Sequence, residues 1–292
     1  MTSIFISLFQ KMAYNKLIES GISFADTSET YGLVSRKENL SAEQIIGQCI
    51  EENSERTPLL ASTLCNPWKS LRQGTGIRLG KGSIIHAISK SAERMGASAI
   101  DLYQVPAKMF YVGTPGCVVN ALSLAMDQGL INNVGVCNME KNAMKTFIQK
   151  LSKKGYTLTS NQFEFSLVNR KALKSGLIKT CKDLGVIPIA HTPLGRGLAT
   201  GIFTATNPTG GQVSGQQPFP FETLEKYSTL HTMLATVQKK VRVRLEKENR
   251  NLQDRRGRYR GESVRFIIIK YFSSVKDTSL SSFFSLLLIL RR

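Results

Sequence analysis

Two side chains that could move a proton stand close together near the start of the chain. Asp26 and Tyr31 lie in "GISFADTSETYG", residues 21–32, where a short apolar run leads into polar residues. A carboxylate and a phenol at this spacing could share a proton transfer. A free phenol has a pKa near ~10, however, so it needs a favourable neighbour to act as an acid near neutral pH. The same stretch could also be an ordinary polar turn, and the choice depends on the elements that position it.

Six short β-rich runs predict strands, at residues 22–26, 58–62, 99–105, 132–136, 158–165 and 186–193. Between several of them, apolar residues recur with helical spacing and predict helices at 83–96, 142–155 and 173–185. Strands that alternate with helices predict a parallel sheet, because parallel neighbours need a crossover connection. The fold class is therefore α/β, either a doubly wound sheet or a (β/α) barrel. In both, function sits at the carboxyl ends of the strands.

Polar or otherwise distinctive side chains end every one of the predicted strands. They are Asp26, Thr63, Gln104, Pro106, Cys137, Asn138, Gln162, Glu164, His191 and Thr192. The carboxyl ends of parallel strands meet at one edge of a sheet, so these residues are expected to lie together and to build one site. Strand ends also border polar loops in proteins that have no site there, and the pattern alone leaves that alternative open.

Four better-known kinds of site fit this sequence poorly. The glycine-rich run at 74–83 lacks the spacing of a nucleotide phosphate loop. The run at 193–201 misses the dinucleotide-binding spacing by one residue, although its glycines could let the backbone approach a phosphate. His86, His191 and His231 are too few and too scattered for a metal site, and no nucleophile elbow is present. His86 is expected to be structural, whereas His191 could contact a ligand.

The composition is that of a globular protein, with 41% hydrophobic and 21% charged residues. The five cysteines are odd in number and scattered, which favours a reducing compartment over a disulfide framework. The chain shows no basic leader and no apolar run near the ~20 residues that a membrane-spanning helix needs. We therefore expect a cytoplasmic protein with no membrane partner.

The formal net charge is +18, and residues 242–292 contribute +8 of it, from 13 Lys and Arg against 5 Asp and Glu. Residues 242–261 are rich in arginine and include Tyr259, as in some nucleic-acid-binding arms. That run gives way abruptly to apolar segments without the alternation seen before. We therefore expect residues 1–241 to form the folded barrel-like domain, residues 242–292 to be a tail that is not a folded domain, and no binding of nucleic acid.

Five stretches, in order and at barrel spacing, resemble the aldo-keto reductase family: "GISFADTSETYG", "IDLYQV", "QGLINNVGVCN", "LTSNQFEFSLVNRK" and "GVIPIAHTPLGRGLATGIF". The resemblance covers about residues 12–240 and is closest to the plant and algal type, so a plastid location is a second possibility. It implies a (β/α)8 TIM barrel that uses NADP(H) to reduce aldehydes and ketones. Only about six strands are recognisable, and the first and last are missing, so the barrel is expected to be incomplete.

The resemblance also implies roles for individual residues. Asp26 and Tyr31 match two of the four catalytic residues of the family, the tyrosine being the acid that protonates the carbonyl oxygen. The residues that match cofactor-binding positions are Asn138 and Gln162 for the nicotinamide carboxamide, His191 for stacking on the ring, and Thr192, Leu194 and Gly195 for the loop around the pyrophosphate. Cys137 stands where the family usually has serine.

Two catalytic positions depart from the family pattern. Thr63 stands where the family has lysine, and Pro106 stands where it has histidine. Losing one preorganised polar group typically costs roughly 10²–10³ in rate, so impaired catalysis is expected. Two interpretations follow: an NADPH-dependent reductase of small carbonyl compounds with impaired activity, or a non-catalytic homologue that acts as a cofactor sensor or protein-binding subunit. The sequence does not identify the substrate or the oligomeric state.

Overall fold

Six parallel strands form a single sheet in chain order. The computed structural model describes residues 12, 14–16, 18, 23–31, 40–52, 58–64, 80–112, 115–210, 218–233, 236, 267–270 and 284–287. The strands are β1 (Phe24–Ser28), β2 (Leu59–Thr63), β3 (Leu102–Pro106), β4 (Val134–Cys137), β5 (Leu158–Glu164) and β6 (Ile187–His191), each hydrogen-bonded in parallel to the next. This confirms the six predicted strands and their parallel arrangement.

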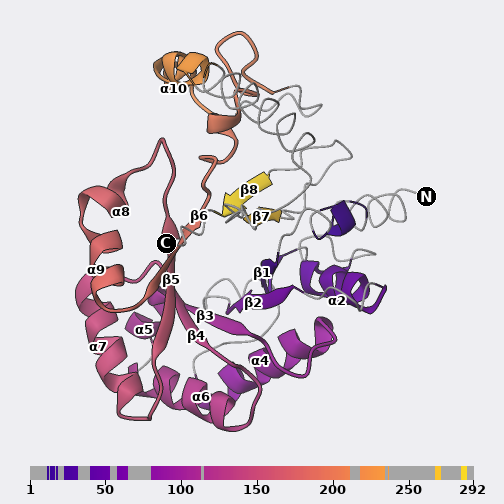
Figure 1. Cartoon of the computed structure of the whole chain (residues 1–292), viewed down its shortest axis with the longest axis vertical. Coiled ribbons are helices and arrows are strands. Elements are labelled where there is room, and N and C mark those ends of the chain that lie inside the picture. The colour runs from indigo at the N-terminus through magenta and orange to yellow at the C-terminus, as the bar shows by residue number, and fades with distance from the viewer. Residues whose placement is uncertain are drawn as a thin grey trace, which may run out of the picture.

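The sheet curves into an open half-barrel with helices on its outside (Figure 1). The helices are α2 (Ala42–Glu52), α4 (Lys81–Arg94), α5 (Ala107–Val112), α6 (Pro115–Asp127), α7 (Lys141–Ser152), α8 (Lys171–Lys174), α9 (Leu177–Asp183) and α10 (Phe221–Lys226), with a short 3₁₀ turn η1 (Leu198–Thr200). In Figure 1, α2, α4, α6, α7 and α9 follow the outer side of the curve. This arrangement confirms the expected α/β fold and an incomplete (β/α) barrel.

The helix predicted at 173–185 is in fact two helices, α8 and α9. Gly176 lies between them with a φ of 75°, a left-handed conformation that glycine adopts readily. Of the predicted apolar stripe, Cys181 is fully buried, whereas Leu173 and Leu184 are 44% and 39% exposed. The spacing of apolar residues was helical, but it could not reveal the break at the glycine.

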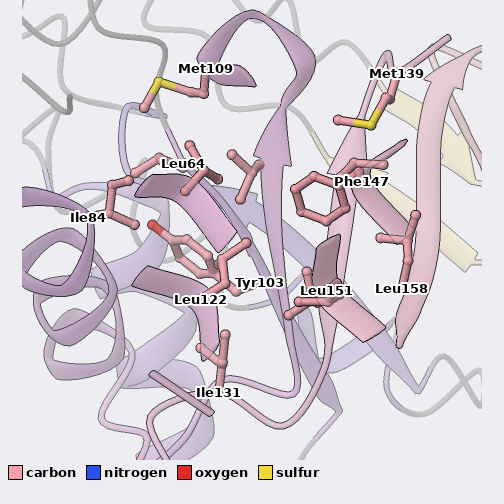
Figure 2. Close-up of a cluster of buried hydrophobic side chains, with 14 of the residues drawn as sticks. Leu64, Ile84, Tyr103, Met109, Leu122, Ile131, Met139, Phe147, Leu151 and Leu158 are labelled. Carbon is pink, nitrogen blue, oxygen red and sulfur yellow. The ribbon is translucent and has the colours of Figure 1, made fainter. Parts of the chain in front are cut away.

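The main core fills the space between the outer face of the sheet and the helices. Figure 2 shows Tyr103 of β3 and Phe147 of α7 among the buried apolar side chains of this cluster. In α7, Met144, Phe147 and Leu151 share one buried face, as the helical spacing predicted. A smaller cluster of Leu198, Phe203 and Leu224 joins η1 to α10.

A buried ion pair ties two helices to the second strand. The Glu43 side chain of α2 is fully buried, and its Oε2 lies 2.6 Å from Nε and 2.6 Å from the terminal guanidinium nitrogen of Arg94 in α4. Its Oε1 accepts a hydrogen bond from Ser62 Oγ at 2.7 Å. Every carboxylate oxygen is therefore partnered, as a buried charge requires. The contact fixes α2 and α4 against β2.

Beyond residue 236 the described residues are two short strands, β7 (Ile267–Lys270) and β8 (Phe284–Leu287), which pair antiparallel. They lie near the two edges of the main sheet, β7 near β1 and β8 near β6 (Figure 1). The predicted domain boundary at 241/242 and Tyr259 lie outside the described residues. Within the part of the chain that the structure describes, no helix is both long and apolar enough to span a bilayer.

Candidate functional site at the carboxyl ends of the strands

The strand register places the predicted site residues on one face of the sheet. Residues paired across parallel strands share a face. Three such rows run along the carboxyl ends: Ser28, Thr63 and Gln104; Pro106, Cys137 and Gln162; and Glu164 with His191. Asp26 lies on the same face of β1 as Ser28, two residues along the strand. The register therefore brings together side chains that are far apart in the sequence.

The centre of this cluster is a carboxylate held by two neutral amides. Asp26 is 8% exposed, and its Oδ1 accepts a hydrogen bond from Gln104 Nε2 at 2.7 Å. Its Oδ2 accepts a second hydrogen bond from Gln162 Nε2 at 2.9 Å. No cation forms an ion pair with Asp26 among the described residues. Among the described residues, the hydrogen-bond partners of the carboxylate are therefore the two amide donors.

Burial dominates the acidity of this carboxyl group. Desolvation raises the pKa of Asp26 from its ordinary value of 3.8 to about 7, and the hydrogen bonds from Gln162 and Gln104 oppose that rise only in part. The group consequently changes its protonation state near neutral pH. A buried group of this kind in a polar cluster is typical of functional sites, although structural networks also produce it.

Gln104 is one of the strand-end residues expected at the site, but its sequence position gave it no individual role there. Its side chain is fully buried, and Nε2 also lies 3.3 Å from Thr63 Oγ1. Its Oε1 has no hydrogen-bond partner among the described residues. The space for it comes from Gly135, where an added Cβ would lie 3.0 Å from Gln104 Cγ and 2.5 Å from Ser160 Oγ. The signal that could have singled out Gln104 is the absence of lysine at position 63, which leaves the carboxylate of Asp26 in need of another donor.

A second set of contacts leads from Gln162 out to the next strand ends. Cys137 Sγ lies 3.8 Å from Gln162 Oε1, and Asn138 Nδ2 lies 3.7 Å from the same sulfur. Asn138 Oδ1 lies 3.2 Å from Nε2 of His191, whose Nδ1 lies 3.2 Å from Thr192 Oγ1. Four residues predicted to bind a cofactor, Asn138, Gln162, His191 and Thr192, are thus connected to one another and to Asp26.

Two of these residues adopt backbone conformations that are unusual for their types. Asn138 has a φ of 57° and Thr192 a φ of 50°. Left-handed backbone is uncommon for residues other than glycine, especially when they are β-branched, and it concentrates at functional sites. Both residues directly follow the ends of strands, Asn138 after β4 and Thr192 after β6.

The loop after β6 contains a glycine that no other residue could replace without displacement. Gly195 has a φ of 59°, and an added Cβ would lie 2.5 Å from Val168 Cγ2. Its N–H donates to Thr192 O at 2.8 Å, closing a tight turn. Leu194 O accepts from the N–H of Gly197 at 3.1 Å and of Ala199 at 2.9 Å. The loop is compact and held by its own backbone.

The remaining positions that match family catalytic residues lie at or just after the ends of β1, β2 and β3. Tyr31 is partly buried in the turn after β1. Its backbone N–H donates to Ser28 O at 3.0 Å, and its backbone carbonyl oxygen accepts from Ala42 N at 2.9 Å. Thr63 and Pro106 end β2 and β3, and Gln104 Nε2 touches both Thr63 Oγ1 and Asp26. A cation at position 63 would therefore lie beside the buried carboxylate, and this chain has none there.

The chemistry of the donor set fits a carboxamide. The Asn138 and Gln162 amides each have two N–H groups and an oxygen with two lone pairs, and the contacts above use one of each. Each amide thus retains one donor and one acceptor, the complement of a nicotinamide carboxamide. Among the residues that the structure describes, no group of three or more side chains could hold a metal ion.

Comparison with known proteins agrees with the sequence resemblance. The model of the "Aldo/keto reductase family" matches residues 9–247. Similar proteins include chloroplastic pyridoxal reductase of Arabidopsis thaliana, 25% identical over 68% of this chain and 54% of the relative. NADH-specific methylglyoxal reductase of Escherichia coli is 26% identical over 70% of this chain and 63% of the relative. The chain thus spans between about half and two thirds of the length of these relatives.

Solved structures share the fold. A thermostable aldo-keto reductase in complex with the inhibitor epalrestat superposes with a TM-score of 0.55 at 21% identity, covering 67% of this chain and 62% of that one. An aldo/keto reductase from Klebsiella pneumoniae in complex with NADP and acetate gives a TM-score of 0.52 at 22% identity, covering 65% of this chain and 60% of that one. At these identities the likeness concerns the fold alone.

Proposed function

We propose that this chain, which belongs to the aldo/keto reductase family, binds NADP(H) at the carboxyl ends of its strands and reduces small aldehydes or ketones. The observation that carries the proposal is the connected cluster of Asp26, Gln162, Asn138 and His191 at one mouth of the half-barrel. Relatives named for the reduction of pyridoxal and methylglyoxal support carbonyl reduction as the reaction class.

The residues take the following roles in this proposal. Asn138 and Gln162 hold the nicotinamide carboxamide, His191 lies against the ring, and the loop of Thr192, Leu194 and Gly195 lies along the pyrophosphate. The bound cofactor would supply hydride to the carbonyl carbon. Tyr31 would donate the proton to the carbonyl oxygen, and Asp26, the other residue that matches a catalytic position, would support this proton transfer.

The activity is expected to be weak because the tyrosine lacks its usual neighbours. An acid with the ordinary pKa of a phenol near ~10 donates poorly at neutral pH unless a cation stands beside it. Thr63 supplies no charge, and the Pro106 ring can neither donate nor accept a hydrogen bond. This absence of charge around Asp26 favours one alternative, a non-catalytic homologue that binds cofactor as a sensor or serves as a protein-binding subunit.

Restoring both family residues separates the two functions. The double variant Thr63→Lys/Pro106→His should increase NADPH-dependent reduction of a short-chain aldehyde by roughly 10²-fold or more, since each preorganised group typically contributes about 10²–10³. The matched control is Leu59→Lys, which adds the same charge to the exposed amino end of the same strand. If the double variant binds NADPH and gains no activity over that control, the non-catalytic function holds instead.

A further inference from the structure

The contacts from Thr192 to Asp26 form one continuous hydrogen-bond chain with a single direction. An ionised Asp26 can only accept, so Gln162 turns its Nε2 towards Oδ2 and its Oε1 towards Cys137. The Cys137 S–H then donates to Gln162 Oε1, and its sulfur accepts from Asn138 Nδ2. The donor and acceptor roles of each group in this chain are therefore fixed by those of its neighbour on the Asp26 side.

The outer half of the chain fixes the tautomer of the histidine. Asn138 Oδ1 can only accept, so the proton of a neutral His191 ring lies on Nε2, at 3.2 Å from that oxygen. Nδ1 must then accept from the hydroxyl of Thr192, also at 3.2 Å. Thus the ionised carboxylate at one end implies the Nε2–H tautomer of His191 at the other.

The same heavy atoms can carry the chain in the opposite direction. Amide oxygens and nitrogens exchange places by a half-turn of the side chain, with almost no change of shape. If Asp26 is protonated on Oδ2, its O–H donates to Gln162 Oε1, the amide donates to the Cys137 sulfur, and the thiol donates to Asn138. The Asn138 amide then donates to Nε2 of His191, and Nδ1–H donates to Thr192.

The alternative acceptor for the Asp26 proton is less favourable. Gln104 lies against Oδ1 and could also turn its Oε1 towards the carboxyl group. Its amide nitrogen would then occupy the fully buried position of the present Oε1, which has no partner among the described residues. Two N–H groups would be left without an acceptor, and buried donors are rarely left so. The proton consequently belongs on the side of Gln162.

We propose that Cys137 and His191 are positioning residues in this hydrogen-bond chain, in which every donor and acceptor exchanges roles when Asp26 gains a proton. The tautomer of His191 then reports the protonation state of Asp26. The thiol can fill its place because burial, reinforced by Asp26, raises the pKa of Cys137 to about 12 and keeps the S–H protonated. Burial lowers the pKa of His191, which favours the neutral ring; of the charged groups that act on it, Glu164 opposes this shift and Arg196 adds to it.

The reversal would change what the mouth offers to a ligand. With Asp26 ionised, the hydroxyl hydrogen of Thr192 is committed to His191 Nδ1. With Asp26 protonated, Thr192 accepts from His191 and its own hydrogen is free to donate to an anion. This consequence rests on the proposed function, in which Thr192 lies along the cofactor pyrophosphate: affinity for NADPH should then rise about 10-fold on protonation, the equivalent of one hydrogen bond.

Nitrogen NMR of the full chain labelled with ¹⁵N-histidine tests the reversal without any cofactor. The signals of His191 are identified by their loss in His191→Gln. Between about pH 8 and about pH 6, the proton of the neutral ring should move from Nε2 to Nδ1, a change that the two ring shifts distinguish from formation of the imidazolium cation. A single tautomer throughout this range overturns the proposal.

Two variants test the route and the source of the effect. Cys137→Ser keeps a donor and acceptor and should retain the change of tautomer, whereas Cys137→Ala interrupts the chain and should abolish it. Asp26→Asn, which does not titrate, should also abolish it. A change that persists in a folded Cys137→Ala protein overturns the proposal, and if that variant does not fold, the titration of Asp26→Asn beside the unaltered chain decides. If the tautomer changes but the affinity for NADPH does not, the result contradicts the proposed function and still supports the reversal of the hydrogen-bond chain.

Discussion

At the scale of single residues, the site differs from what the family pattern implies in how its carboxylate is held. Asp26 is buried between two glutamine amides, without the cation that a lysine would supply at Thr63. Both amide donors come from strand ends far along the chain, so their convergence could be predicted only as a strand-end cluster. Which side chain donates to which depends on the strand register and on the space that Gly135 leaves.

The raised pKa of Asp26 predicts a pH-dependent penalty to folding. The native state holds this proton up to about pH 7, whereas the unfolded chain releases it near 3.8, so the contribution of Asp26 to stability is present at low pH and is lost as the pH rises through about 7. Asp26→Asn removes the penalty, and its oxygen and amide nitrogen can bond Gln162 and Gln104. The variant should be more stable than the parent at about pH 8, with an upper bound of about 4 kcal/mol.

Urea unfolding at about pH 8 and about pH 5 checks this prediction. The difference in free energy of unfolding between Asp26→Asn and the parent should shrink at the lower pH. Asp183→Asn is the matched control, because Asp183 is exposed and pairs with Lys179 on the surface. An equal effect of Asp26→Asn at both pH values would contradict the raised pKa.

At the scale of elements, the alternation of strands and helices could be predicted from the sequence because each element buries one face. All six strands appear within a few residues of their predicted positions. The split between α8 and α9 was not readable, because the left-handed conformation of Gly176 breaks the helix without disturbing the apolar spacing around it. Close approaches between elements were likewise hidden, since they depend on atoms from distant segments.

One such approach joins α2 to the end of α4. A Cβ added to Gly47 would lie 2.7 Å from the carbonyl oxygen of Arg94 and 3.0 Å from the carbonyl carbon of Met95. Gly47→Ala should therefore lower the free energy of unfolding by about 1–3 kcal/mol, because backbone cannot move aside as a side chain can. The helix propensity of alanine, worth about 1 kcal/mol, opposes this only in part.

Gly82→Ala in α4 is the control for the gain in helix propensity that alanine brings. No atom lies within 4 Å of a Cβ added there, so the same substitution should leave stability unchanged or raise it by up to about 1 kcal/mol. Thermal or urea unfolding of the two variants side by side makes the comparison. If Gly47→Ala changes the free energy of unfolding no more unfavourably than Gly82→Ala does, α2 and α4 are not in this contact.

At the scale of the whole molecule, six parallel strands form a half-barrel whose carboxyl ends carry the cluster. In the described part of the chain, β1 and β6 are the edges of the main sheet, and the β7–β8 pair lies near both. Strand number, tilt and shear are linked in a closed barrel, so six strands leave the sheet open. The residues proposed to bind the cofactor nevertheless lie in or directly after β4, β5 and β6, which are adjacent in the sheet.

The measurement that most directly tests this account is a calorimetric titration of the full chain with NADPH. We expect saturable binding at one site, weakened about 10-fold or more in Gln162→Leu, which removes a carboxamide partner. Gln149→Leu, an exposed position on α7, should bind like the parent. The absence of saturable binding in a sample with a cooperative unfolding transition, or equal binding by Gln162→Leu and the parent, would contradict a cofactor site at the carboxyl ends of these strands.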